Sequence, residues 1–333
     1  MRLSRRLLLQ GAGAAGLGLL AACGRLPFQA QAPAKVPRLG VLAVSGEPND
    51  PDNEGFRQGL RELGYVEGQN VTLEWRSFGS RLEQLPELAA ELVGLPVDVI
   101  VTHGGTATRA AKQASDTIPI VMAYTNDPDK LGLVTSLAHP GGNVTGMAAM
   151  TSQLAAKRLE LLRETLPGLA RVAMHWNPDT IRGNEFEGLA AAAQALGLEG
   201  LQSIELHDDA SLESAFASIR RGRPDALFLQ GTVRVTRHQQ EIADFSIAHR
   251  LPTTSSRRDF AVAGCLMSYG PDYAQMNRRA AYYVDRILKS TRPADLPVEQ
   301  PREFDFAINL KTASALGLTI PERVLLQATE VIQ

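Results

Sequence analysis

From residue 38 onward, short apolar runs alternate with longer segments in which apolar side chains recur at helical spacing. Several short runs are continuously apolar and bounded by Gly or Pro, which is typical of strands covered by helices on both faces. Segment 53–63 shows the helical pattern, because Phe56, Leu60 and Leu63 share one face and a glycine follows. The predicted strands are 39–44, 71–75, 97–102, 118–124, 172–176, 200–206, 226–229, 252–255, 266–269 and 304–308.

The order of these elements predicts an α/β fold of two doubly wound, Rossmann-like lobes with parallel sheets. Four strands precede Thr145 and four more lie between Arg171 and Ser268, with the Gly-rich segment 141–146 as a joint. A long helix and one strand remain, so we expect several crossings between the lobes and a multi-strand hinge that permits closure. The expected boundaries are 38–146 plus about 269–297 for lobe 1, and 147–268 plus about 298–333 for lobe 2.

The first 22 residues have the pattern of an export signal. Three arginines stand within the first six residues, and residues 7–22 carry no charge. A basic start, an apolar run of about 7–15 residues and a small-residue end are typical of secretory signals. The G-x-G-x-x-G letters at 11–16 lie inside this segment, outside any strand–turn–helix context, and therefore do not indicate a nucleotide site.

The end of that segment predicts a lipid anchor. Leu20, Ala21, Ala22 and Cys23 form a lipobox, so we expect cleavage before Cys23, lipidation of its thiol and a flexible tether over 23–37. The alternative is a plain secretory signal with an incidental cysteine. Arg5 and the arginine after it also fit a twin-arginine signal, and both the twin-arginine and Sec routes stay open.

Composition narrows the function further. Loss of the three signal arginines takes the formal charge from −2 to −5, which gives no basic face for nucleic acid. With Cys23 lipidated, Cys265 is the one cysteine left, and no intramolecular disulfide is expected. Its apolar surroundings predict a small buried hydrophobe. The remaining 311 residues are more than one ordinary core needs, which favours two domains.

A set of local motifs resembles one family across 38–332. The chain resembles the ABC transporter substrate-binding proteins related to tryptophan-binding lipoproteins. The motifs that carry this resemblance are 55–70 (GFRQGLRELGYVEGQN), 118–121 (IPIV), 127–128 with 131–134 (DP, LGLV), 140–146 (PGGNVTG), 157–162 (KRLELL), 266–270 (LMSYG) and 308–313 (INLKTA).

The resemblance implies a type 1 periplasmic binding fold and the substrate-binding lipoprotein of an ABC importer, anchored in the periplasm or at the cell surface. Its expected partners are a small-molecule solute and a permease in the inner membrane, and we expect a monomer. Many relatives have a Trp-Arg-Glu-Phe-like stretch where residues 256–260 read SRRDF. Asp259 is one methylene shorter than that glutamate, which puts the relatives' ligand in doubt for this chain.

Candidate ligand-binding residues of lobe 1 follow the predicted strands, because open α/β sheets bind ligands beyond the carboxyl ends of their strands. Gly104, Gly105 and Thr106 precede a predicted helix near Ala107, where free N–H groups suit a carboxylate; the alternative is a simple N-cap by Thr106. Four further candidates are Ser45, Tyr124, Asn126 and Asp127. For Asp127 the alternative is an Asx turn with a Pro-fixed helix start.

Lobe 2 offers Asn177 and Gln230 at strand ends and Asp259 as a partner for a ligand amine. For Asp259, an ion pair with Arg257 or Arg258 is the alternative. Trp176 is either a ligand-stacking ring or part of the core. A few polar anchors between apolar walls favour a small polar solute with a carboxylate, such as an amino acid, aromatic ones included.

No catalytic constellation is found. The chain lacks a nucleophile elbow, a Walker A loop and an H-E-x-x-H motif, and its six histidines have no metal-ligand spacing, so we expect neither an enzyme nor a metal or other cofactor. Two alternatives remain: a ligand-sensing periplasmic protein that docks on a membrane sensor, and a periplasmic hydrolase with dispersed residues. Fold alone does not separate these functions.

Overall fold

The computed structural model of the chain describes residues 35–47, 49–79, 81–176, 183–205 and 211–333. Pro37–Gln333 forms one compact unit. The predicted signal peptide, Cys23 and most of the predicted tether lie outside the described residues.

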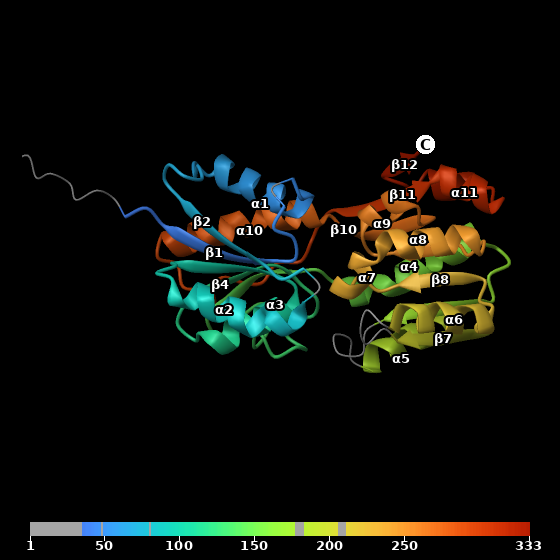
Figure 1. Cartoon of the computed structure of the whole chain (residues 1–333), viewed down its shortest axis with the longest axis horizontal. Helices are drawn as coiled ribbons and strands as arrows, with labels where there is room; N and C mark the ends of the chain where they lie inside the picture. The colour runs from blue at the N-terminus through green and yellow to red at the C-terminus, as the bar shows by residue number, and fades with distance from the viewer. Residues whose placement is uncertain (1–34, 48, 80, 177–182, 206–210) are drawn as a thin grey trace, which may run out of the picture. The chain divides into compact units, whose positions relative to one another are not determined.

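Five strands form the first sheet, in the order β2-β1-β3-β4-β5, and every neighbouring pair is parallel. Helices α1 and α10 cover one face and α2 and α3 the other, each through its own buried apolar cluster (Figure 1). The bounds are β1 Arg38–Ala43, α1 Pro51–Glu62, β2 Thr72–Ser77, α2 Leu85–Gly94, β3 Val99–His103, α3 Gly105–Ala114, β4 Ile120–Thr125, β5 Val144–Ala148 and α10 Tyr273–Leu288.

Seven strands form the second sheet, in the order β12-β11-β10-β9-β8-β6-β7, and only β10 and β11 pair antiparallel. The bounds are α4 Thr151–Thr165, β6 Arg171–Trp176, α5 Gly183–Ala195, β7 Gly200–Glu205, α6 Leu212–Gly222, β8 Ala226–Leu229, α7 Val233–Arg237, α8 Gln239–Ala248, β9 Thr253–Ser255, α9 Arg258–Ala263, β10 Met267–Pro271, β11 Phe304–Asn309, α11 Leu310–Leu316, α12 Glu322–Leu325 and β12 Glu330–Ile332.

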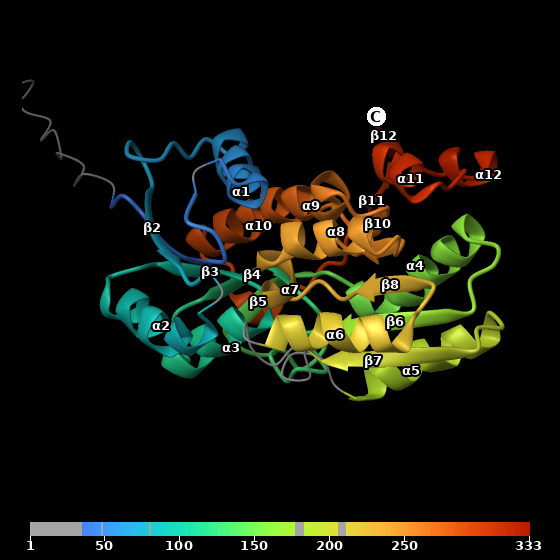
Figure 2. The same ribbon diagram turned by 45° about the vertical axis from the view of Figure 1, so that its right-hand side comes forward.

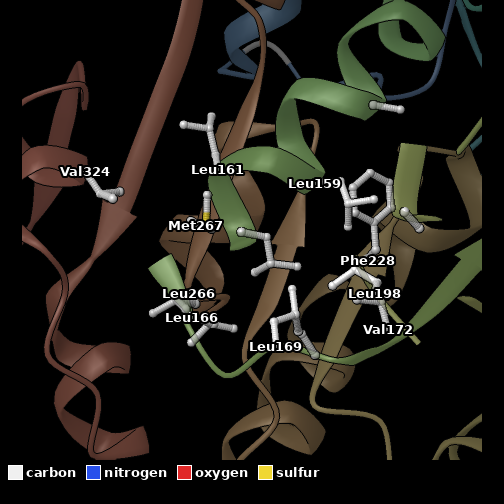
Figure 3. Close-up of a cluster of buried hydrophobic side chains, with 14 of the residues drawn as sticks. Leu159, Leu161, Leu166, Leu169, Val172, Leu198, Phe228, Leu266, Met267 and Val324 are labelled. Atoms are coloured by element: carbon white, nitrogen blue, oxygen red, sulfur yellow. The ribbon is translucent and has the colours of Figure 1, made fainter. Parts of the chain in front are cut away.

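Two apolar clusters hold this sheet between its helices. Helices α4, α5, α11 and α12 contribute to one cluster, and Figure 3 shows Leu159 of α4 beside Phe228 of β8 within it. Helices α6, α8 and α9 contribute to the other, and Figure 2 shows α6 and α8 along the sheet. Both faces are therefore covered, which explains the continuous apolar runs of β6 and β8.

We call the five-stranded sheet with its helices lobe 1 and the seven-stranded sheet with its helices lobe 2. The chain crosses between them from β5 to α4, from β10 to α10, and from α10 back to β11. Helix α10 lies against α1 although more than 200 residues of sequence separate them. The residue boundaries expected for the lobes, and any movement about the crossings, stay predictions.

The structure corrects several predicted elements. The Gly-rich joint is in part a fifth strand, β5, in which the backbone of Gly146 at φ 125° lies against Met122. Lobe 2 also has more strands than predicted, because β10 joins its sheet and the short β12 pairs with β11. The sheets are mostly rather than wholly parallel, since β11 enters from a hinge crossing instead of a helical crossover.

Candidate functional site

The carboxyl ends of β1, β3 and β4 are neighbours in the sheet of lobe 1, so the residues after them lie along one edge. Ser45 follows β1, where its hydroxyl accepts from the Glu47 N–H at 3.1 Å. Its carbonyl oxygen accepts from the Asn53 amide of α1 at 3.0 Å. These bonds fix Ser45 between the sheet and the start of α1.

The Gly104 turn after β3 is open toward this edge. Gly104 has φ 87°, a left-handed conformation that suits glycine, and its N–H donates to the Tyr124 carbonyl oxygen at 2.9 Å. Helix α3 begins at Gly105, before the predicted Ala107, and no side chain caps it. The N-cap interpretation of Thr106 is wrong, because Gly104 is the N-cap and Thr106, which is exposed, is already the second residue of the helix. The first-turn N–H groups, which have no intrahelical acceptors, thus remain available to an anion.

Three aromatic rings lie in contact with one another at the same edge, tilted or edge to face. The Tyr124 ring lies 5.2 Å from that of His103 and 5.0 Å, edge to face, from that of Tyr273 at the start of α10. Burial, helped by the charge of Arg257, lowers the pKa of His103 to about 3, so this imidazole is neutral. Burial also raises the pKa of Tyr124 well above its usual value. The rings are therefore uncharged at neutral pH and offer an apolar wall.

Asn126 and Asp127 lie in the turn after β4. Asp127 is buried, and its backbone has the left-handed conformation at φ 41°. Its Oδ1 lies 3.6 Å from Lys130 Nζ, and its buried Oδ2 has no hydrogen-bond partner among the described residues. The predicted helix start is wrong, because Pro128 continues a turn rather than a helix. Among the described residues, no recorded hydrogen bond or ion pair joins Asn126 or Asp127 to the other candidates.

In lobe 2, Gln230 and Asp259 each bind an arginine side chain. Asn177 lies outside the described residues. Gln230 follows β8, and its Oε1 accepts from Arg158 Nη2 at 3.1 Å. Asp259 is in the first turn of α9 and pairs with Arg257 at 3.2 Å, while Arg258 pairs with Glu330 of β12. The ion-pair interpretation of Asp259 is therefore the observed state of this structure.

Sequence reasoning missed the residue that joins the two lobes here. Asp52, in the first turn of α1, accepts from Arg257 at 3.4 Å. The turn is set by Asp50, whose carboxylate accepts from the Asp52 N–H at 3.0 Å, and by Pro51 at the first helical position. The Arg257 guanidinium also lies 4.4 Å from the centre of the Tyr273 ring, a cation–π contact. The sequence carries a signal for the cap, but none for this long-range contact.

The electrostatics of this group are strongly perturbed. Burial raises the pKa of Asp52, although the Arg257 charge opposes the shift. Burial alone would lower the pKa of Arg257, but the carboxylates of Asp52 and Asp259 outweigh it and raise the pKa. Arg257 is thus a permanent cation between two acids.

A second missed residue is Arg158 of α4, which is 0% exposed. Its Nη1 donates to the Tyr269 carbonyl oxygen at 3.4 Å, and its guanidinium lies 4.8 Å from the Phe228 ring centre. Burial lowers the pKa of Arg158 to about 10, so it stays charged at neutral pH. Within the described ranges no carboxylate lies at ion-pair distance from it.

The described residues contain neither a cluster of metal ligands nor a membrane-spanning helix. No group of three or more His, Cys, Asp or Glu side chains among them could hold a metal ion. No helix in that part of the chain is long and apolar enough to span a bilayer.

The predicted buried character of Cys265 is confirmed. The residue is 0% exposed and belongs to the apolar cluster beneath α6, α8 and α9. Burial raises the pKa of its thiol to about 12, so it is protonated at neutral pH.

Known proteins share this fold and about a quarter of the aligned residues. The "Tyrosine-binding protein" of Clostridioides difficile (strain R20291) is 24% identical over 286 residues, which cover 85% of this chain and 82% of that protein. A conserved domain protein from Vibrio cholerae O1 biovar El Tor is 28% identical with a TM-score of 0.83, over 89% of this chain and 100% of its own. A Streptococcus pneumoniae ABC domain in complex with L-Trp is 25% identical with a TM-score of 0.81, over 89% and 99%.

These likenesses and the two mostly parallel sheets confirm the expected type 1 periplasmic binding fold. The sequence profile described as "ABC transporter substrate binding protein" matches residues 40–332, from the first strand of lobe 1 to the last strand of lobe 2. With so nearly complete a match, the chain belongs to the ABC transporter substrate-binding protein family.

Proposed function

We propose that this chain is the substrate-binding lipoprotein of an ABC importer and that it captures an amino acid, aromatic ones included, by closure of its two lobes. Members of the family bind small-molecule ligands, work with ABC permeases and are periplasmic or extracellular. The lipobox ending at Cys23 supports the lipid anchor of the proposal.

The observation that carries the proposal is the charged and aromatic cluster between the lobes. Asp52, Tyr124 and Tyr273 come from lobe 1, whereas Arg257 and Asp259 come from lobe 2. Two acids suit a ligand amine, and two neutral rings suit an apolar or aromatic side chain. The proteins named for tyrosine and crystallised with L-Trp support the same ligand class.

Closure follows from where these groups are anchored. The amine partner Asp52 stands on α1, and Arg257 stands on the segment after β9 in the other sheet. A ligand amine can replace Arg257 as the partner of Asp52. The Asp52 carboxylate would then pair with Arg257 in the free protein and with the ligand amine in the complex. Binding energy for such a state comes from several desolvated contacts, since a micromolar affinity corresponds to about −8 kcal/mol.

The test is a thermal-unfolding screen of residues 24–333 against the twenty amino acids, benzoate, glucose and adenosine. A ligand that binds only the folded state adds roughly 2.7 kcal/mol of stability at a hundredfold excess over its Kd. We expect a clear rise in Tm with one or more amino acids, weakened in Asp52→Asn. A rise only with glucose or adenosine, or none with any compound, would overturn the amino-acid proposal.

A further inference from the structure

Arg158 is a buried cation with no carboxylate partner among the residues that the structure describes. Its side chain is 0% exposed, and its recorded partners are two neutral oxygens, those of Gln230 and Tyr269. Transferring an unpaired charge out of water is costly, and proteins ordinarily pair such charges. Lys157, the preceding residue on α4, follows that rule and pairs with Glu160 at 2.9 Å. The partly exposed Lys157 thus has a carboxylate partner, whereas the buried Arg158 has none in the described part of the chain.

The atoms around Arg158 are rich in unused donors. No hydrogen-bond partner is found for the Arg158 Nε–H or for the buried hydroxyl of Thr254. Thr254 pairs in register with Phe228, the residue whose ring lies against the guanidinium, so the hydroxyl and the cation share one face of the sheet. The Ser256 hydroxyl is also buried and has no hydrogen bond of standard geometry, but it lies near enough to the Tyr273 hydroxyl to act as its hydrogen-bond partner and to lower its pKa. Free donors beside a cation are complementary to an anion.

These donors lie where a solute would arrive. Gln230 follows the carboxyl end of β8 and Ser256 that of β9, and ligands of open α/β sheets bind beyond those ends. The other arginine in this region, Arg257, already holds Asp52 and Asp259. An incoming carboxylate therefore meets one neutralised arginine and one arginine that has no counter-ion among the described residues.

Movement of Tyr273 together with lobe 1 would give a solute access to Arg158. Burial raises the pKa of this first residue of α10, and the charges of Arg257 and Arg158 oppose the shift, yet its helix packs with lobe 1. Arg158 belongs to α4, which packs on the sheet of lobe 2. Separation of the lobes would withdraw Tyr273 from Arg158, and closure over a solute would bury the new pair.

We propose that Arg158, together with Gln230 and Ser256, binds the carboxylate of the captured solute on the lobe 2 side of the cleft. This inference rests on the proposed function, because it assigns one group of an amino-acid ligand. It places the carboxylate at Arg158 rather than at the Gly104 turn, and leaves the acids Asp52 and Asp259 for the amine.

The test compares each amino acid with its carboxamide, which keeps the amine and side chain but loses the negative charge. The probes are L-tyrosine, L-tryptophan and L-leucine, with L-tyrosinamide, L-tryptophanamide and L-leucinamide, titrated by calorimetry into residues 24–333. We expect the wild-type chain to bind the acid roughly 10- to 100-fold more tightly than the amide, the range of a charge-assisted hydrogen bond. In Arg158→Gln this ratio should fall to within about threefold.

A second variant covers the case in which Arg158→Gln does not fold. Gln230→Glu places an acid 3.1 Å from Arg158 Nη2 and supplies the missing counter-ion from within the protein. We expect this variant to fold, to have a Tm at or above that of the wild type, and to lose the preference for the acid. Lys157→Gln is the matched control, because it removes one exposed charge from the neighbouring position and should keep the ratio.

The outcomes separate the two proposals. If a wild-type acid probe binds and its ratio to the amide survives in both Arg158→Gln and Gln230→Glu, the carboxylate assignment is wrong. A ratio that collapses in Thr106→Pro, which removes an N–H from α3, but not in Arg158→Gln would assign the carboxylate to the Gly104 turn. If neither these three acids nor any other amino acid of the thermal-unfolding screen binds the wild-type chain, the proposed function itself falls and the assignment with it.

Discussion

At the scale of single residues, the cleft contrasts two arginines. Arg257 is held by two carboxylates, one from each lobe, whereas Arg158 is buried against amide, carbonyl and ring groups. The two arginines therefore have different roles. Arg257 links the lobes in the free protein, and Arg158 is the proposed partner of a ligand carboxylate. Burial also decides the charge state of His103, whose imidazole is neutral at neutral pH.

His103 gives the site a testable pH dependence. Its folded pKa of about 3 lies below the unfolded value of about 6.5, so the unfolded chain binds a proton that the folded chain excludes. The stability it contributes is complete above pH 6.5 and falls by up to about 1.4 kcal/mol per pH unit as the pH drops toward the folded pKa. Urea unfolding between pH 7.5 and 4.5 should show a shallower loss in His103→Gln than in the wild type.

The comparison isolates His103 because other groups are common to both proteins. His175, whose pKa burial lowers to about 4, destabilises the fold in acid in the same direction. Asp52 acts oppositely, since its raised pKa makes the folded state bind a proton more tightly as the pH falls. Parallel pH profiles for the wild type and His103→Gln would show that His103 does not stay neutral in the folded state.

Cys265 gives a second prediction at this scale. In a chain lacking Cys23 it is the one thiol, fully buried and with a pKa of about 12. Because the thiolate is the reactive form, we expect no reaction with Ellman's reagent at pH 8 in the folded state and one equivalent in 6 M guanidinium. Rapid reaction of the folded protein would mean that the lobe 2 cluster opens readily.

At the scale of elements, glycines let α1 and α10 come into close contact. A Cβ on Gly59 would lie 2.3 Å from the Arg278 carbonyl oxygen, and one on Gly55 would lie 2.3 Å from that of Ala274. The two glycines are four residues apart and so share one face of α1. This contact matters for the site, because α1 carries Asp52 and α10 carries Tyr273.

Gly59→Ala should therefore destabilise the fold by about 1–3 kcal/mol, since the helices must move apart to admit a methyl group. Gly188→Ala in α5 is the matched control: nothing lies within 4 Å of the added Cβ, and the change should stabilise by about 0.5–1 kcal/mol through helix propensity. Equal effects of the two substitutions in urea unfolding would show that the close packing of α1 on α10 is not maintained in solution.

Sequence reasoning succeeded where the signal is local. Ten strands were predicted within a few residues, because buried parallel strands are continuous apolar runs between Gly and Pro. Strand β5 was missed because Thr145 and Gly146 interrupt its apolar run, and the reason for a glycine there, the close backbone of Met122, is a tertiary contact. Edge strand β12 has three residues, too few for a periodic signal.

The site divides in the same way. Ser45, Gly104 and Gln230 follow strands, and Tyr124 is the last but one residue of β4, so a rule about strand ends finds them. Arg158, Asp52 and Tyr273 stand on helices, and their meeting depends on how each helix packs on its sheet. Spacing along the chain does not specify that packing, and the lone buried charge of Arg158 became visible only once its neighbours were known.

At the scale of the whole molecule, three crossings join two sheets that each have a complete core. The contact of Arg257 with Asp52 between the lobes is polar, whereas the cores within the lobes are apolar. Rearranging the lobes should therefore cost far less than unfolding either of them. A bound solute is therefore expected to change the spacing of the lobes without changing their internal packing.

The most direct test of this claim is a single-molecule energy-transfer measurement between one dye on each lobe. Glu87→Cys on α2 and Glu213→Cys on α6 provide exposed labelling sites, while the buried Cys265 should remain unlabelled and Cys23 is left out. Saturation with the amino acid that binds most tightly should shift the distance distribution to a single shorter state, and the same chain with Gln230→Glu should not respond to it. Calorimetric binding with an unchanged distance distribution would contradict capture by closure.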